Sequence, residues 1–118
     1  MKIVIALLMM VSAVLVQAAE PARSAPGVVQ IQGRYVIDVR TQEEWESGHI
    51  EGAVHIPYDQ IDSHIAEVTT DKAAHIGLYC QSGGRAAAAL ATLKSKGYTN
   101  VENLGGMATA RKTLDISP

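Results

Sequence analysis

Short apolar runs alternate with segments of helical composition along most of the chain. Strands that alternate with helices through short connections favour a mostly parallel sheet that is covered on both faces. We therefore predict an α/β fold with three layers, α/β/α, and a central, mostly parallel sheet of about five strands. Five runs have the length and composition of strands: Val28–Ile31, Tyr35–Val39, His49–Ile56, Ile76–Tyr79 and Tyr98–Asn103.

The segments between these runs carry signals for helices. Thr41 and Glu44 lie at the ends of a capping-box pattern, T-Q-E-E, which predicts a short helix that ends at Gly48. Trp45 is expected to pack this helix onto the sheet. The acidic residues of the helix, Glu44 included, are expected to form a solvated face. Three more helices are predicted: Asp59–Val68, with Ile61, Ile65 and Val68 on one face; Ala86–Lys96, closed by a C-cap glycine at Gly97; and Met107–Leu114.

The first eighteen residues have the pattern of a secretory signal peptide. Lys2 precedes an apolar stretch, Ile3–Val16, and V-Q-A at 16–18 supplies small residues before a cleavage point. The apolar stretch is shorter than the roughly 17–25 residues of a transmembrane helix, although an uncleaved anchor is the alternative. We expect a periplasmic protein with no stable membrane association, divided into a signal peptide (1–18), a flexible lead-in (19–27) and one folded domain (28–118).

Charge and residue counts argue against several classes of function. The chain has a net charge of -2, and removal of the leader takes away Lys2 and no acidic residue. A nucleic-acid-binding domain usually has a basic surface, so a nucleic-acid partner is not expected. The four histidines have no ligand spacing with one another or with the single cysteine. We therefore predict neither a metal site nor a cofactor.

The single cysteine, Cys80, is the first residue of a loop, C-Q-S-G-G-R, between a predicted strand and a predicted helix. Such a loop directs backbone N–H groups and the positive end of the helix dipole at one spot. Gly83 and Gly84 allow the backbone to curl into an anion-binding nest, and Arg85 adds a positive charge with planar donors. These surroundings favour a reactive thiolate that faces a small anion, whereas a buried, inert cysteine is the alternative.

Four motifs, in this order, resemble those of rhodaneses: V-I-D-V-R at 36–40, G-H-I-E-G-A-V-H-I-P at 48–57, C-x-x-G-x-R at 80–85 and V-E-N-L-G-G-M at 101–107. The resemblance implies a rhodanese-like fold and a sulfurtransferase that carries sulfane sulfur as a persulfide of Cys80. It also implies that Asp38 and Arg40 brace the loop by hydrogen bonds, outside the catalytic step. The residues expected to bind the substrate are those of the loop: Gln81, Ser82, Gly83, Gly84 and Arg85.

The expected reaction moves sulfur from thiosulfate, or a similar small anion, to a thiophilic acceptor such as cyanide, a thiol or the thiol of a partner protein. Phosphatases and arsenate reductases of the same fold are one alternative, but their loop is C-x5-R and this chain has C-x4-R. A non-catalytic interaction module is the other alternative. Such modules usually lack the cysteine or the loop glycines, both of which are present here. The sequence therefore favours a thiosulfate sulfurtransferase.

Overall fold

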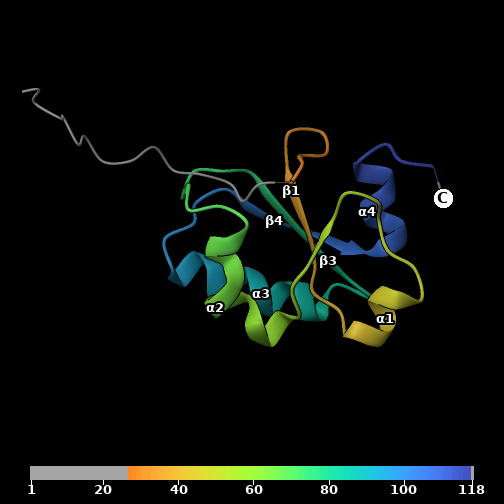
Figure 1. Cartoon of the computed structure of the whole chain (residues 1–118), viewed down its shortest axis with the longest axis horizontal. Helices are drawn as coiled ribbons and strands as arrows, with labels where there is room; N and C mark the ends of the chain where they lie inside the picture. The colour runs from red at the N-terminus through yellow and green to blue at the C-terminus, as the bar shows by residue number, and fades with distance from the viewer. Residues whose placement is uncertain (1–26, 118) are drawn as a thin grey trace, which may run out of the picture.

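A computed structural model describes residues 27–117 and contains a parallel sheet of four strands in the order β2-β1-β3-β4 (Figure 1). The predicted α/β class with a parallel sheet is confirmed. The strands are β1 (Tyr35–Asp38), β2 (Val54–His55), β3 (Ile76–Cys80) and β4 (Val101–Gly106).

The predicted strand at Val28–Ile31 does not form, so the described residues contain four strands and not five. Only Ile31 makes a bridge, to Arg34, with backbone hydrogen bonds of 2.8 and 3.0 Å. Gln32 and Gly33, which lie between Ile31 and Arg34, have positive φ angles of 51° and 74°. Two successive residues with positive φ make a tight reversal, so the chain turns back on itself before β1 and adds no strand to the sheet.

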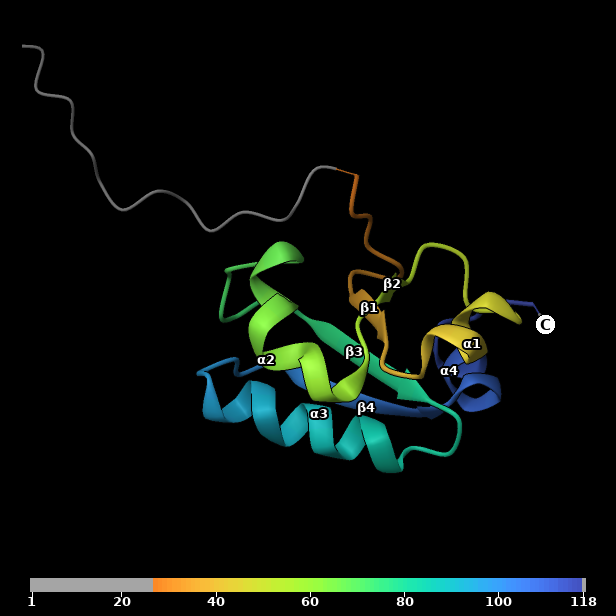
Figure 2. The same ribbon diagram turned by 60° about the horizontal axis from the view of Figure 1, so that its bottom comes forward.

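Helices cover both faces of the sheet, as predicted (Figure 2). One face is covered by α3 (Gly84–Ser95) and by a composite helical segment, which consists of η1 (Tyr58–Gln60), α2 (Ile61–His64) and η2 (Ile65–Glu67). The other face is covered by α4 (Met107–Thr113), while α1 (Gln42–Glu46) lies at the carboxyl edge of the sheet.

Each face of the sheet has its own hydrophobic core. The core under α3 includes Ile37, Leu78 and Leu93, which are all fully buried. The predicted helix at Asp59–Val68 forms as three shorter helical turns, and it still buries Ile61, Ile65 and Val68 in this core. The core on the α4 side consists of Val36, Ile50, Tyr79, Leu104, Ala110 and Leu114.

The helix boundaries differ from the predicted ones by one or two residues. The capping box is confirmed, because the Thr41 side chain accepts from the Glu44 N–H and the Glu44 carboxylate accepts from the Thr41 N–H. The helix after it ends at Glu46, two residues before Gly48. Gly97 has a φ of 96°, as expected of a C-cap glycine, and donates to the Lys94 carbonyl at 3.0 Å.

The last strand lies further along the chain than predicted. Gly105 and Gly106 lie beyond the predicted strand Tyr98–Asn103, yet they end β4 and pair with Tyr79 and Cys80. The register shifts between Leu78 and Tyr79, and Gly105 has a φ of 82° at this bulge. A residue without a Cβ adopts that conformation at no steric cost, so the strand continues through the glycine pair.

Residues 1–26 and 118 lie outside the described part of the chain. The signal peptide at 1–18 and nearly all of the lead-in at 19–27 therefore stay predictions. Within residues 27–117, no helix has the length and hydropathy that crossing a membrane requires.

Candidate active site

Cys80 is the last residue of β3, at the carboxyl edge of the sheet, and only 1% of it is exposed. The backbone N–H of Gly83 donates to its Sγ atom, with N and S 2.7 Å apart. In open parallel sheets, ligands bind at the carboxyl ends of the strands. The sulfur therefore lies where the sequence predicted a reactive thiolate.

The loop after Cys80 turns sharply into α3. Gly83 is the N-cap residue of α3 and has a φ of 96°, which is in the left-handed region. Gly84 begins the helix, so α3 starts two residues before the predicted Ala86. Gln81 and Ser82 are exposed, whereas Cys80 is buried beneath them. Gln81 and Ser82 thus lie at the mouth of the loop, and their role in substrate binding stays a prediction.

The end of β4 supports the loop, a role that the sequence reasoning missed. The Asn103 side chain donates to the Gly83 carbonyl at 3.0 Å and accepts from the Gly105 N–H at 2.8 Å. At Gly106, an added Cβ would lie 2.5 Å from the carbonyl oxygen of Gln81. Gly106 can lie this close to the loop only because glycine has no Cβ. The signal was present in the V-E-N-L-G-G-M motif, to which no role was assigned.

Arg85 binds Glu44 of α1 through both carboxylate oxygens, at 2.7 and 3.0 Å. The hydrogen bonds from Arg85, followed by the one from the Thr41 backbone N–H, lower the pKa of Glu44 to about 2. The expectation that Glu44 belongs to a solvated face is therefore wrong. The guanidinium ties the start of α3 to α1, and its binding of a substrate anion stays a prediction.

Removal of the Glu44 charge should weaken this link. We expect Glu44→Gln to lower the free energy of unfolding at neutral pH by about 1 kcal/mol. The pKa of Glu44 in the folded protein lies below its ordinary value of 4.5. The charged carboxylate therefore stabilises the folded state fully above about pH 4.5, and this contribution is lost as the pH falls toward 2. Denaturant unfolding at pH 7 and at pH 3 measures both effects. The exposed Glu43→Gln is the control, and an equal loss in the two variants would contradict the pairing.

Asp38 and Arg40 form a buried ion pair at the end of β1. Arg40 donates to the Asp38 carboxylate at 2.7 and 3.0 Å and to the Gly48 carbonyl at 2.6 Å. The hydrogen bonds to Asp38 raise the pKa of Arg40. The guanidinium also lies 5.7 Å from the centre of the Tyr79 ring. The pair therefore braces the connection between α1 and β2. That it also braces the cysteine loop stays a prediction.

A family model for the rhodanese-like domain matches residues 21–110, most of the chain. The chain belongs to the rhodanese family. A sulfurtransferase of Allochromatium vinosum is 36% identical over 83 residues, which are 69% of this chain and 76% of the relative. The thiosulfate sulfurtransferase PspE of Escherichia coli is 38% identical over 71 residues, covering 60% of this chain and 68% of PspE. Other relatives are longer: the match to the uncharacterized protein YqhL of Bacillus subtilis, 44% identical, spans 55% of YqhL.

Solved rhodanese structures share the fold. A structure described as a rhodanese with anions from Escherichia coli superposes with a TM-score of 0.62 at 36% identity, covering 64% of this chain and 89% of that one. The human single-domain sulfurtransferase TSTD1 superposes with a TM-score of 0.59 at 25% identity, covering 74% of this chain and 86% of that one. The rhodanese resemblance predicted from the four motifs is thus confirmed.

Trp45 of this rhodanese lies between two histidines. Its indole stacks on the His49 ring, with centroids 3.4 Å apart, and on the His55 ring at 5.0 Å. His55 belongs to β2, so the tryptophan packs α1 onto the edge of the sheet, as predicted. The backbone carbonyl of Arg40 lies 2.8 Å from His55 Nε2. These contacts hold the His55 imidazole in place beside α1, at the carboxyl edge of the sheet.

Proposed function

We propose that this rhodanese is a sulfurtransferase that carries sulfane sulfur on Cys80, with thiosulfate or a similar small anion as donor. The observation that carries the proposal is the Gly83 N–H aimed at Sγ, at the point where β3 meets the N-terminus of α3. The same backbone donor would stabilise the charge of a persulfide. The sulfurtransferases of Escherichia coli and Allochromatium vinosum to which the chain is similar support this reaction.

In the first step, the Cys80 thiolate attacks the outer sulfur of thiosulfate. A new sulfur–sulfur bond forms at Cys80, and the sulfur–sulfur bond of thiosulfate breaks, with its electron pair leaving on sulfite. The thiolate and the dianion thereby become a persulfide anion and a sulfite dianion, so charge and electrons balance. Cys80 is the only cysteine of the chain. The persulfide therefore waits for an external acceptor, which is cyanide, a thiol or the thiol of a partner protein.

Two separate half-reactions should give an isolable intermediate and ping-pong kinetics. We expect thiosulfate alone to yield a protein that is heavier by one sulfur atom and stays so after desalting. Cyanide should then restore the original mass in a single turnover. Intact-mass spectrometry at each stage measures both changes. The proposal fails if sulfite is released only when the acceptor is present from the start.

We also propose that residues 1–18 are removed and that the remaining protein acts in the periplasm. The support is the leader pattern, with Lys2 before the apolar stretch Ile3–Val16. The full chain, expressed in a Gram-negative host and recovered from the periplasmic fraction, should begin at Ala19 by intact mass. Recovery of the uncleaved chain with the membranes would contradict this location.

A further inference from the structure

Positive charge is scarce at the carboxyl edge of the sheet, where Cys80 lies. All lysines and arginines of the chain except Lys2 and Arg23 are among the described residues. Most of them lie before β1 or β3, at the end of α3 or in the last turn of α4, namely Arg34, Lys72, Lys94, Lys96, Arg111 and Lys112. Of the described lysines and arginines, only Arg40 and Arg85 are at the carboxyl edge.

Both of these arginines are already paired with carboxylates. Arg40 binds Asp38, and neither of these side chains is more than 3% exposed. Arg85 directs its two terminal nitrogens at the two oxygens of Glu44, at 2.7 and 3.0 Å. The N–H and the hydroxyl of Thr41 donate to Glu44 Oε1 at 3.1 and 3.0 Å, so the carboxylate is held from two sides. Each ion pair has no net charge, and an incoming anion can bind either guanidinium only by competing with its carboxylate.

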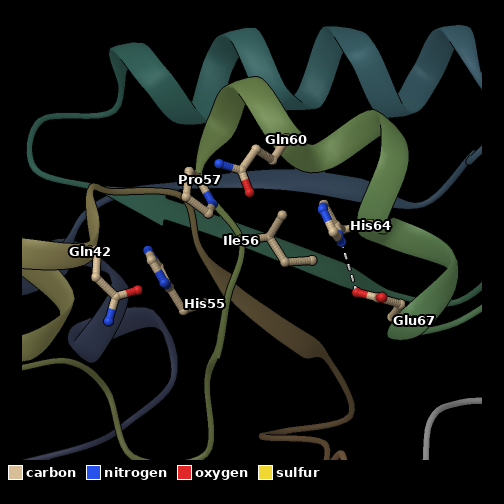
Figure 3. A pocket seen from close by; sticks show the side chains of 7 residues that line it. All are labelled: Gln42, His55, Ile56, Pro57, Gln60, His64 and Glu67. Atoms are coloured by element: carbon tan, nitrogen blue, oxygen red, sulfur yellow. Dashed lines mark hydrogen bonds and ion pairs between the residues drawn. The ribbon is translucent and has the colours of Figure 1, made fainter.

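The rest of this edge adds negative charge. The ion pair ties α1 to the start of α3, and α1 carries two further carboxylates, Glu43 and Glu46, with no basic residue in its last turn (Figure 2). A cleft of about 300 Å³ beside β2 contains no lysine or arginine, and its one carboxylate, Glu67, lies 2.9 Å from His64 Nδ1 (Figure 3). Within residues 27–117, this edge therefore offers a sulfur donor no lysine or arginine that lacks a carboxylate partner.

The charge of the donor should therefore decide how well the site accepts it. The positive end of the α3 dipole is equivalent to only about half of an elementary charge. Coulomb energy is proportional to the charge of the donor, so carboxylates at this edge disfavour a dianion about twice as strongly as a monoanion. Thiosulfate is a dianion. A thiosulfonate, in which an organic group replaces one oxygen of thiosulfate, carries a single negative charge.

We propose that Glu44 is a specificity-determining residue, which holds Arg85 and thereby makes the site favour singly charged donors of the thiosulfonate class over thiosulfate. The inference rests on the sulfurtransferase function proposed above. The Cys80 thiolate attacks the outer sulfur of the thiosulfonate, and a sulfur–sulfur bond forms at Cys80. The sulfur–sulfur bond of the donor breaks, with its electron pair leaving on a sulfinate anion. Two monoanions react and two monoanions form, so charge and electrons balance.

Thiosulfate and methanethiosulfonate are matched probes, because a methyl group replaces one oxygen and removes one charge. Persulfide formation is followed by intact mass at increasing concentrations of either donor, at constant ionic strength and at about pH 8, where histidines are ordinarily neutral. Glu44→Gln releases Arg85 and removes one negative charge. We expect the half-saturating concentration to fall about tenfold for thiosulfate and about threefold for methanethiosulfonate, as a twofold difference in donor charge implies. A purely structural defect would instead raise both concentrations.

Glu43→Gln is the matched control, because it removes the same charge from the same helix and leaves the ion pair intact. Glu43 is exposed, and exposed charges are screened by salt. Both half-saturating concentrations should therefore stay within about twofold of the wild-type values. The inference is overturned if Glu44→Gln leaves saturation by thiosulfate unchanged or weakens it, if both donors change by the same factor, or if Glu43→Gln has the same effect.

Removal of both partners tests whether Glu44 acts through Arg85. Arg85→Gln leaves Glu44 as an unpaired carboxylate and should raise the half-saturating thiosulfate concentration about tenfold. The double variant, Glu44→Gln with Arg85→Gln, has a neutral pair and should return to within about threefold of the wild type. If Arg85 binds the donor in the wild type, the double variant would stay as poor as Arg85→Gln, and the inference would be wrong.

Non-reacting analogues allow a test on the wild type alone. Sulfate is a dianion and methanesulfonate a monoanion of similar size, so methanesulfonate should inhibit persulfide formation at the lower concentration. The reverse order would contradict the inference. Absence of a persulfide with either donor would overturn the proposed function, whereas persulfide formation without the expected selectivity would overturn this inference alone.

Discussion

Replacement of Cys80 with serine is expected to abolish sulfur transfer, by at least about a thousandfold, because the step needs a nucleophilic sulfur that can hold a second sulfur. The fold should survive the change. Serine is similar in size, and the Gly83 N–H that donates to Sγ would give the buried hydroxyl a hydrogen-bond partner. Sulfite release from thiosulfate and intact mass after exposure to the donor measure the loss.

The control for this variant is its structure. Circular dichroism and thermal unfolding should match those of the wild type to within a few degrees. If Cys80→Ser kept more than a trace of transfer, or gained a sulfur atom by mass, the persulfide mechanism would be wrong.

Replacement of Gly106 with alanine should have the second-largest effect, although Gly106 is not in the cysteine loop. The new Cβ would lie 2.5 Å from the Gln81 carbonyl oxygen, and neither atom can rotate away, because the oxygen belongs to the backbone and the Cβ is bonded directly to it. Either β4 or the loop must move, which costs about 1–3 kcal/mol of stability. Because Gln81 follows Cys80 directly, displacement of the loop should also lower the rate of persulfide formation about a hundredfold.

Gly84→Ala is the matched control, since it introduces the same methyl group within the loop itself. An added Cβ at Gly84 meets no atom within 4 Å, and Gly84 is the first residue of α3, where alanine favours the helix. The predicted role of Gly84 in binding the anion belongs to its backbone N–H, which alanine keeps, so we expect Gly84→Ala to form the persulfide at close to the wild-type rate. Equal losses in the two variants would show that the loop tolerates no added side chain, and would contradict the specific role assigned to Gly106.

The local part of the site was predictable from sequence because it depends on neighbours in the chain. Cys80, Gly83 and Gly84 lie within five residues, and the strand and helix on either side have clear composition. The capping box at Thr41 was predictable for the same reason. The strand at Val28–Ile31 was predicted wrongly, because composition did not reveal the reversal at Gln32 and Gly33.

The sequence by itself determined the α/β class, the family and the position of the single cysteine at the end of a strand, since period, capping signals and motif order are local properties of the chain. The tertiary structure alone decided which distant residues meet at the carboxyl edge. Glu44 binds Arg85 across 41 positions, and Asn103 binds Gly83 across 20. The strand order β2-β1-β3-β4 sets how far the carboxyl ends of β1 and β2 lie from Cys80. Such distances depend on which strands pair. Pairing joins segments that are distant in the chain, and their separation in the sequence does not indicate which of them will pair.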